Sequence, residues 1–319
     1  MKKTIAGLLA VLGLVGAAQA QDAYPAQNIR FVVPFTAGSA TDTLARVLAN
    51  RMSTTLGRTV VVENIAGGYG IPAAQNVVRS APDGYTVMVT ANTTHAGNQA
   101  LLKKVPYDAA ADFEPITKLG SITLALVANP SVPANNLKEL IAYAKANPGK
   151  LTFGAGSSSS RMSAELLKTM AGIDMLHVPY KSNPQAVTDL LGGQISIFFG
   201  DVSTAIPPVR AGKLKGFAVS GLKRSALAPD LPTIDESGLK GYELTAWFAA
   251  YAPAKTPKPI VDKLNAAFRD ALGNKDVADK LLNAGIEPEA STPDELKTFQ
   301  AAETKKWAKI ATDAKIEKE

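Results

Sequence analysis

Short apolar strands alternate with amphipathic helices along this chain, and no other feature of the sequence restricts its fold so strongly. Between residues 29 and 90 the expected order is strand, helix, strand, helix, strand, with the strands at residues 29–35, 59–63 and 85–90. Strands joined by helices in this way run parallel and are covered by those helices. This part of the chain therefore predicts an α/β fold.

A second series of the same kind begins near Ser121. Helices are expected at residues 137–146 and 183–191, the latter with Asn183 as its N-cap and Pro184 in its first turn. Further strands are expected at residues 122–128, 151–154, 177–180, 195–199 and 215–220. The alternation of strands and helices thus occurs twice along the chain.

The tail from Pro257 is mostly helical and has no strands of its own to cover, so we expect it to pack on the first series. Thr292 to Glu295 form a capping box that starts its last helix. Two series and a length of 319 residues suit two domains with a cleft between them. The chain is expected to cross between the domains near Gly120 and Trp247. The expected boundaries are residues 21–120 plus 249–319 for the first domain and residues 121–248 for the second.

The composition excludes several classes of protein. The sequence has no cysteine, which removes disulfide scaffolds, cysteine-bound zinc, iron–sulfur clusters and thiol catalysis. Its 2 histidines, His95 and His177, are too few for a histidine-rich metal site. The net charge is +6, but the lysines and arginines are scattered without interleaved aromatic residues, so no nucleic-acid partner is expected. We expect neither a metal nor a cofactor.

The first residues have the pattern of a cleavable secretory signal peptide. Lys2 and Lys3 precede a short apolar stretch at residues 5–15, and Ala18 and Ala20 fit a small-x-small cleavage site. The stretch is too short for a membrane anchor, which needs about 20 apolar residues. The sequence therefore predicts that residues 1–20 are removed and that the mature protein is periplasmic.

The first candidate binding loop joins the first strand to the helix that follows it. Its members are Phe35, Thr36, Ala37, Gly38 and Ser39. Small residues let a ligand approach the backbone, and free N–H groups at the start of a helix attract an anion. The alternative is an ordinary capped helix, with Thr41 or Asp42 as the cap.

The second candidate loop follows the strand at residues 151–154 and has the same strand–turn–helix design. Its members are Ala155, Gly156, Ser157, Ser158, Ser159 and Ser160. Four consecutive hydroxyl groups are more than a cap requires, although a flexible solvent loop is the alternative. Ligands bind beyond the carboxyl ends of parallel strands, where both loops would lie. Asn92 and Thr93 follow the strand at residues 85–90 and would lie at the same edge as the first loop.

Both loops offer hydrogen-bond donors and neither offers a compensating negative charge, so we expect a ligand with a carboxylate. The chain has no phosphate-binding P-loop and no G-x-S-x-G nucleophile motif. Gly68 to Ala73 fits G-x-G-x-x-A but follows the second strand, so we interpret it as a tight turn. A serine hydrolase would need His95 or His177 as its base, and the sequence offers no convincing nucleophile–base pair. We therefore expect a binding protein and not an enzyme.

Many short motifs occur in the order found in one known family. They are Tyr24-Pro25, Val33-Pro34-Phe35, Val62-Glu63-Asn64, Gly67-Gly68-Tyr69-Gly70, Pro82-Asp83-Gly84-Tyr85-Thr86, Val105-Pro106-Tyr107-Asp108, Asn147-Pro148-Gly149-Lys150, His177-Val178-Pro179-Tyr180-Lys181, Asp189-Leu190-Leu191-Gly192-Gly193-Gln194 and Ala252-Pro253-Ala254-Lys255-Thr256-Pro257. On these motifs the mature chain resembles, over almost its full length, the Bordetella uptake gene (Bug) family. These are periplasmic solute-binding proteins of tripartite tricarboxylate transporters.

The resemblance implies a two-domain periplasmic-binding-protein (Venus-flytrap) fold that closes around a small carboxylate. In the family, the two loops hold one carboxylate through backbone amides, hydroxyl groups and waters, which implies those roles for Thr36–Ser39 and Ala155–Ser160. The resemblance also implies that Asp201 faces the cleft, and it places Tyr180 of the motif His177–Lys181 among the ligand-binding residues.

Three residues depart from the family pattern in the expected site. Ser39 and Ser182 stand where a glycine is usual, and Arg161 stands where a histidine is usual. An arginine in the cleft would suit a second acidic group, so the ligand is expected to be an aliphatic or aromatic dicarboxylate. Alternatively, Arg161 points outward or pairs with Glu165 one helical turn later.

The sequence thus predicts a monomeric protein that captures a small organic carboxylate for transport by membrane subunits. An exported carboxylic ester hydrolase and a ligand sensor that feeds a signalling partner remain the alternatives.

Overall fold

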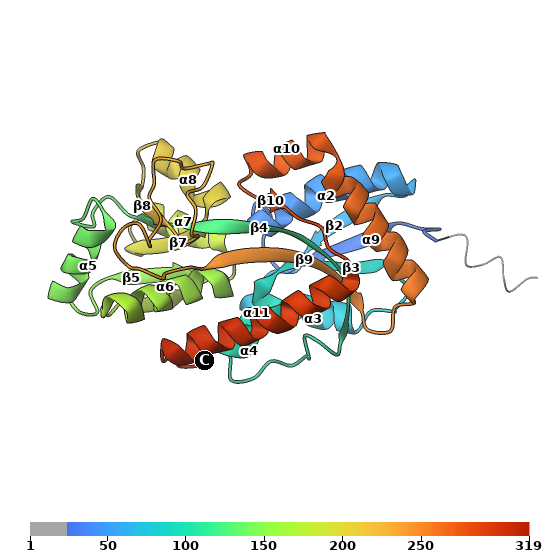
Figure 1. The fold of residues 1–319 in the computed structure, drawn as a ribbon, viewed down its shortest axis with the longest axis horizontal. Helices are drawn as coiled ribbons and strands as arrows, with labels where there is room; N and C mark the ends of the chain where they lie inside the picture. The colour runs from blue at the N-terminus through green and yellow to red at the C-terminus, as the bar shows by residue number, and fades with distance from the viewer. Residues whose placement is uncertain (1–23, 319) are drawn as a thin grey trace, which may run out of the picture.

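The computed structural model describes residues 24–318, so the expected signal peptide at residues 1–20 lies outside the described residues. The molecule is elongated, with two groups of strands arranged along its long axis (Figure 1). Helices cover each group, and two long strands run between the groups. Over residues 24–318, no helix is both long enough and apolar enough to span a bilayer.

The first strand group contains β1 (Ile29–Val33), β2 (Val60–Asn64) and β3 (Thr86–Ala91), which pair in parallel in the order β2-β1-β3. Helices α2 (Ala40–Leu56) and α3 (Ile71–Val78) connect the strands, as the alternation of patterns predicts. This group also contains the short helical segments η1 (Gly68–Gly70), η2 (Thr93–Gly97) and α4 (Asn98–Leu101).

The second strand group has the same design. Strands β7 (Ile197–Asp201), β5 (Thr152–Ala155) and β6 (Leu176–Pro179) pair in parallel in that order. Strand β8 (Lys215–Val219) pairs antiparallel with β4 (Phe113–Ala128). The helices around it are α5 (Leu137–Ala146), α6 (Ser158–Ala171), α7 (Asn183–Leu191) and α8 (Val202–Arg210). These elements match the expected second α/β series, except that no helix was expected at α8.

Two antiparallel strands, β4 (Phe113–Ala128) and β9 (Thr245–Pro253), join the groups. β9 also pairs with β3, and the C-terminal end of β4 pairs with β7 and β8, so both groups belong to one continuous sheet. The crossings expected near Gly120 and Trp247 lie within this pair, where Ser121 is opposite Trp247.

Most of this linking pair of strands was not predicted from the sequence. The sequence predicts a strand only at residues 122–128 of β4 and none at β9. The first half of β4 contains a proline, a lysine and a glycine and has two irregularities in its pairing with β9, so it lacks regular alternation. β9 is rich in alanine, which is depleted in strands. Because both strands extend into both groups, the residue boundaries of the two domains stay a prediction.

The C-terminal segment covers the first strand group, as the sequence predicts. α9 (Lys258–Gly273) packs on α2 and β4, and α10 (Lys275–Asn283) packs on α2 and α9. α11 (Pro293–Asp313) lies along β4, η2 and α4. One detail differs, because the short strand β10 (Glu287–Pro288) pairs with β4 at Gly120 and Ser121 although no strand is expected in the tail.

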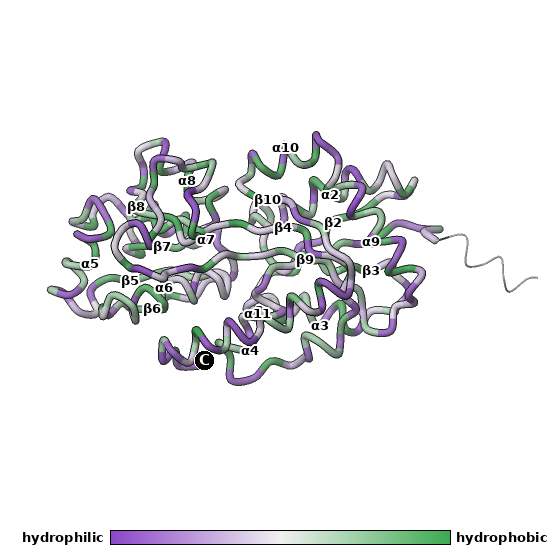
Figure 2. Tube along the Cα trace, viewed as in Figure 1, coloured by the Kyte–Doolittle hydropathy of each residue, from purple (hydrophilic) through white to green (hydrophobic). Residues whose placement is uncertain are grey.

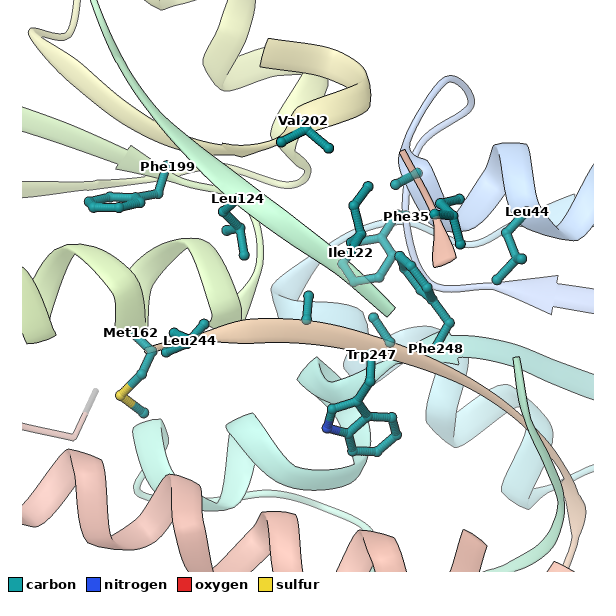
Figure 3. Close-up of a cluster of buried hydrophobic side chains, with 14 of the residues drawn as sticks. Phe35, Leu44, Ile122, Leu124, Met162, Phe199, Val202, Leu244, Trp247 and Phe248 are labelled. Carbon is teal, nitrogen blue, oxygen red and sulfur yellow. The ribbon is translucent and has the colours of Figure 1, made fainter. Parts of the chain in front are cut away.

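Apolar side chains form a continuous core through both groups, and polar residues lie on the outer helices (Figure 2). In the first group, the ring of Phe31 in β1 stacks on that of Phe268 in α9, with the ring centroids 5.4 Å apart. In the second group, Phe199 of β7, Leu124 of β4 and Met162 of α6 belong to a cluster of buried apolar side chains (Figure 3). The site described below sits where the two parts of this core meet.

Removal of the N-cap of α11 should lower stability modestly. The hydroxyl of Thr292 accepts a hydrogen bond from the Glu295 N–H at 3.2 Å, and the Glu295 carboxylate accepts one from the Thr292 N–H at 2.8 Å, which confirms the predicted capping box. Thr292→Ala should therefore cost about 1 kcal/mol of unfolding free energy, measured by urea denaturation. Thr298→Ala, at an exposed position inside the same helix, is the control. Equal costs for both variants would mean that the cap is not responsible.

Candidate ligand-binding cleft

A small cavity lies between the two strand groups, at the carboxyl ends of their parallel strands. Its lining residues are Phe35, Ser39, Thr41, Ala91, Ser157, Ser159, Ser182, Asn183, Asp201, Ala246 and Phe248. The structure thus brings together residues of both predicted loops, although they are far apart in the sequence. This position is where ligands bind in open parallel sheets.

Ser39 starts the helix of the first loop. Its Oγ accepts a hydrogen bond from the N–H of Asp42 at 3.2 Å, which makes Ser39 the N-cap of α2. The sequence suggests Thr41 or Asp42 as the cap, and the structure corrects this to Ser39. Ser39 and Thr41 both line the cavity.

Asp42, in the first turn of α2, places a negative charge beside the first loop. Its carboxylate accepts hydrogen bonds from the Gly38 N–H at 3.0 Å, from Arg46 Nε at 3.0 Å and from Asn64 Nδ2 at 2.9 Å. Burial acts to raise the pKa of Asp42, but the hydrogen bonds from Arg46, Gly38 and Asn64 outweigh it and lower the pKa. The expectation that neither loop offers a compensating charge is therefore wrong, because the Gly38 amide already has an internal acceptor.

Ser157 caps the helix of the second loop in the same way. Its Oγ accepts a hydrogen bond from the Ser160 N–H at 3.2 Å and lies 3.2 Å from Ser159 Oγ. Ser157 and Ser159 line the cavity, whereas Ser160 Oγ donates to the carbonyl oxygen of Phe199 at 2.5 Å. All of these serines are buried, so the alternative of a flexible solvent loop is wrong.

Ser158 contacts the first strand group and not the cavity. Its N–H donates to Thr93 Oγ1 at 3.3 Å, and its Oγ donates to Asn98 Oδ1 at 3.2 Å. Gly97 lies against it, because a Cβ added at Gly97 would stand 2.3 Å from the Cβ of Ser158. Ser158 and Thr93, both expected to bind a ligand, therefore bind each other and hold the two groups together beside the cavity.

Ser182 and Asn183 both line the cavity. From the sequence, Ser182 was placed in the expected site only as a departure from the family pattern, and Asn183 was not expected to be a site residue. Ser182 occupies the N-cap position of α7, where the sequence predicts Asn183. The Asn183 side chain instead links three parts of the site. Its Oδ1 accepts a hydrogen bond from the Gly156 N–H at 3.2 Å, and its Nδ2 donates to Asp201 Oδ2 at 3.2 Å and to Ser157 Oγ at 3.4 Å. The available signal was the serine at position 182 where the family has a glycine.

One side of the cavity is apolar. Phe35 and Ala91 come from the first strand group, and Ala246 and Phe248 come from β9. Phe35 and Phe248 lie near each other in Figure 3, close to Ile122 of β4. The two β9 residues were missed because β9 itself was not predicted as a strand.

Three residues expected in the site make their contacts elsewhere. Arg161 Nη2 donates to the carbonyl oxygen of Glu317 at 3.0 Å, Tyr180 Oη donates to Asp189 Oδ2 at 2.8 Å, and Asn92 Oδ1 accepts a bond from the Trp247 N–H at 3.4 Å. They are not lining residues of the cavity. The pairing of Arg161 with a second acid of the ligand is thus corrected, because this guanidinium is turned to the C-terminal segment. The remaining expected residues shape the two loops beside the lining: Thr36, Ala37, Gly38, Ala155, Gly156 and Ser160.

Asp201 brings a carboxyl group to the cavity, as the resemblance implies. It ends β7, precedes α8 and is 8% exposed. Burial raises the pKa of Asp201 to about 6, and hydrogen bonds from Asn183 and the backbone oppose this rise.

The histidines lie outside the cavity lining. His95 is buried against Tyr251, with ring centroids 3.7 Å apart, and burial lowers its pKa to about 3. His177 stacks on Phe153 at 5.1 Å. Across residues 24–318, no three or more His, Asp or Glu side chains are grouped so that they could hold a metal ion.

The chain matches one known family along most of its length. Residues 44–316 match the family described as tripartite tricarboxylate transporter family receptor.

Three solved structures are similar to this chain over both strand groups. An R. palustris protein with adipate has a TM-score of 0.90 and 34% identity, covering 93% of this chain and 100% of that one. The periplasmic binding protein BugD has a TM-score of 0.88 and 35% identity, covering 93% and 100%. MatC from Rhodopseudomonas palustris, with bound malate, has a TM-score of 0.86 and 32% identity, covering 90% and 100%. The expected fold class, α/β with two domains around a ligand cleft, is therefore confirmed.

Proposed function

The chain belongs to the tripartite tricarboxylate transporter receptor family, as its resemblance to Bug proteins predicts, and we propose that it captures a small dicarboxylate outside the cytoplasm for uptake. The family is one of solute-binding receptors. Membership of the family does not by itself specify that the ligand is a dicarboxylate. That class of ligand is supported by neighbours that were solved with adipate and with malate.

The observation that carries this proposal is the convergence of two capped helix starts on one cavity. Ser39 begins α2, Ser157 begins α6, and both residues line the cavity. The N-terminus of a helix carries a partial positive charge of about half a unit and presents N–H donors. Two such ends can hold a carboxylate without a fixed cation.

Buried hydroxyl groups and an apolar wall support the same ligand. Thr36 Oγ1 in the first loop and Ser182 Oγ in the cavity lining are buried, and neither has a hydrogen-bond partner among residues 24–318. A buried polar group without a partner costs about 1–3 kcal/mol, which a ligand oxygen can offset by accepting the hydrogen bond. The wall formed by Phe35, Ala91, Ala246 and Phe248 suits the methylene groups of a dicarboxylate.

The domain division and the partners belong to the same proposal. Residues 21–120 with 249–319, and residues 121–248, move as two domains that close on the ligand, which is a population shift toward the closed state. The mature chain is a periplasmic monomer that delivers its ligand to the membrane subunits of a tripartite transporter, and it breaks no bond.

Binding should require a free carboxylate. Each charge-assisted hydrogen bond to a carboxylate contributes about 1.5–3 kcal/mol, and about 1.4 kcal/mol corresponds to tenfold in affinity. The dimethyl ester of adipic acid should therefore bind at least about 100-fold more weakly than adipate. Isothermal titration calorimetry measures both affinities, and a thermal-shift screen extends the comparison to malate and other acids. Equal affinities for acid and ester would reject the proposal, as would a screen in which no carboxylic acid binds.

A further inference from the structure

The cavity contains a carboxyl group of its own where a carboxylate ligand is proposed to bind. Asp201 lines the cavity, and its Oδ2 accepts a hydrogen bond from Asn183 Nδ2 at 3.2 Å. Within the part of the chain that the structure describes, the lining includes no lysine, arginine or histidine. A second negative charge would therefore have no cation in the cavity to balance it.

The charged side chains on the elements around Asp201 have other partners. They form the ion pairs Arg46–Asp42 on α2 and Lys168–Glu165 on α6, and the hydrogen bonds from Arg161 of α6 to Glu317, from Tyr180 to Asp189 of α7 and from Arg210 of α8 to Leu227. β4 places apolar Leu124 opposite Asp201, and Lys181 before α7 is exposed. The side chains that share the cavity with Asp201 are hydroxyl, amide and apolar groups.

We propose that Asp201 takes up a proton when a carboxylate ligand binds and then donates a hydrogen bond to that ligand. This inference rests on the proposed function. It identifies the cavity with a protonated Asp201 as the state that binds an anion. Two ionised carboxylates in one site repel each other, and a proton shared between them removes the repulsion. The proton also converts Asp201 from an acceptor into a donor, while its other oxygen still accepts from Asn183.

The surroundings of Asp201 already favour the proton. Burial raises the pKa of Asp201 to about 6, against the opposing effect of the Asn183 and backbone hydrogen bonds. The charge of a bound carboxylate raises the pKa further, so protonation becomes favourable near neutral pH. A ligand that offered an ammonium group to Asp201 would lower the pKa instead. A carboxylate at Asp201 and an ammonium group at Asp201 therefore give opposite dependences of affinity on pH.

The affinity for adipate should fall as the pH rises. Below about pH 6 Asp201 is already protonated, so affinity depends little on its titration. Above about pH 6 the free protein loses the proton that the complex needs, and each pH unit should weaken binding by up to about tenfold. This weakening ends where the pH exceeds the pKa of Asp201 in the complex.

Titration calorimetry of the mature chain with adipate and with malate, from about pH 6 to about pH 8, tests this inference. Measurement in buffers of different ionisation enthalpy gives the number of protons bound, which should approach about one per ligand at the upper end of this range. Asp201→Asn has nearly the same shape and no charge, so its affinity for adipate should not fall as the pH rises, and its binding should take up no proton. Asp262→Asn removes an exposed carboxylate on α9 and should keep the wild-type pH dependence.

The outcomes separate the two proposals. Wild-type binding that is independent of pH, or that tightens as pH rises, would overturn the proton inference and leave the proposed function standing. Failure of every carboxylic acid to bind at any pH would overturn the proposed function, and the proton inference with it. The number of protons that the wild-type chain takes up per ligand tests the proton inference even if Asp201→Asn is too unstable to measure.

Discussion

Replacement of Gly97 by alanine should weaken the binding of adipate about 10- to 100-fold while the unliganded protein stays as stable as before. Gly97 belongs to the first strand group, and an added Cβ would stand 2.3 Å from the Cβ and 2.7 Å from the Oγ of Ser158 in the second group. Overpacking of this kind costs about 1–3 kcal/mol, and about 1.4 kcal/mol is tenfold in affinity. Opening of the two domains, as proposed above, would separate Gly97 from Ser158 and relieve this clash.

The backbone at Gly97 gives no other reason for a glycine. Its φ of −67° and ψ of −42° are helical, a conformation that alanine adopts readily. Alanine in place of glycine inside a helix stabilises by about 0.5–1 kcal/mol. Gly97→Ala should therefore favour the open state by preventing close contact, without strain within either group.

Calorimetry gives the affinity of Gly97→Ala, and urea unfolding gives its stability. The matched variant is the double change Gly97→Ala with Ser158→Gly, which removes the opposing Cβ. The double variant should bind adipate about as well as Ser158→Gly alone. If Gly97→Ala binds like the wild type, the contact between Gly97 and Ser158 does not persist in the liganded protein.

Elements with local signals were predicted closely, and elements defined by pairing were not. α5 begins and ends as predicted, because Asn136 accepts a hydrogen bond from the Glu139 N–H at its start and Pro148 follows its end. The first half of β4 and the whole of β9 have no comparable local signal. They are strands because each lies beside the other and beside a parallel group, and such long-range pairing leaves little trace in a single sequence.

The position of the cleft was predictable, but the role of each residue in it was not. Strand–turn–helix patterns with serines indicate both loops, and both loops line the cavity. Ser157 is the extended N-cap of α6 and Ser158 is its first helical residue. Ser157 and Ser159 line the cavity, whereas Ser158 between them contacts the other group. Arg161 donates a hydrogen bond to the carbonyl oxygen of Glu317, which is 156 residues away. No local pattern encodes a contact over that distance.

Gly156→Ala should lower the stability of the protein as well as its affinity for the ligand, whereas Gly97→Ala should lower the affinity alone. A Cβ at Gly156 would stand 2.2 Å from the carbonyl carbon of Ser182 and 2.4 Å from the nitrogen of Asn183. These are backbone atoms of the same strand group, so opening of the cleft does not relieve the contact. The start of α7 must move, and the bond from the Gly156 N–H to Asn183 Oδ1 must lengthen.

We expect Gly156→Ala to lose about 2–3 kcal/mol of unfolding free energy in urea denaturation, at the upper end of ordinary overpacking costs. Gly273→Ala is the control, since its added Cβ would meet no atom within 4 Å and neither glycine has the left-handed backbone that alone would penalise alanine. Binding of adipate should fall as well, because Asn183 positions Ser157 and Asp201. A Gly156→Ala protein as stable as Gly273→Ala would show that the α7 start yields easily. In that case the close packing of the second loop against α7 would not hold the cavity residues in place.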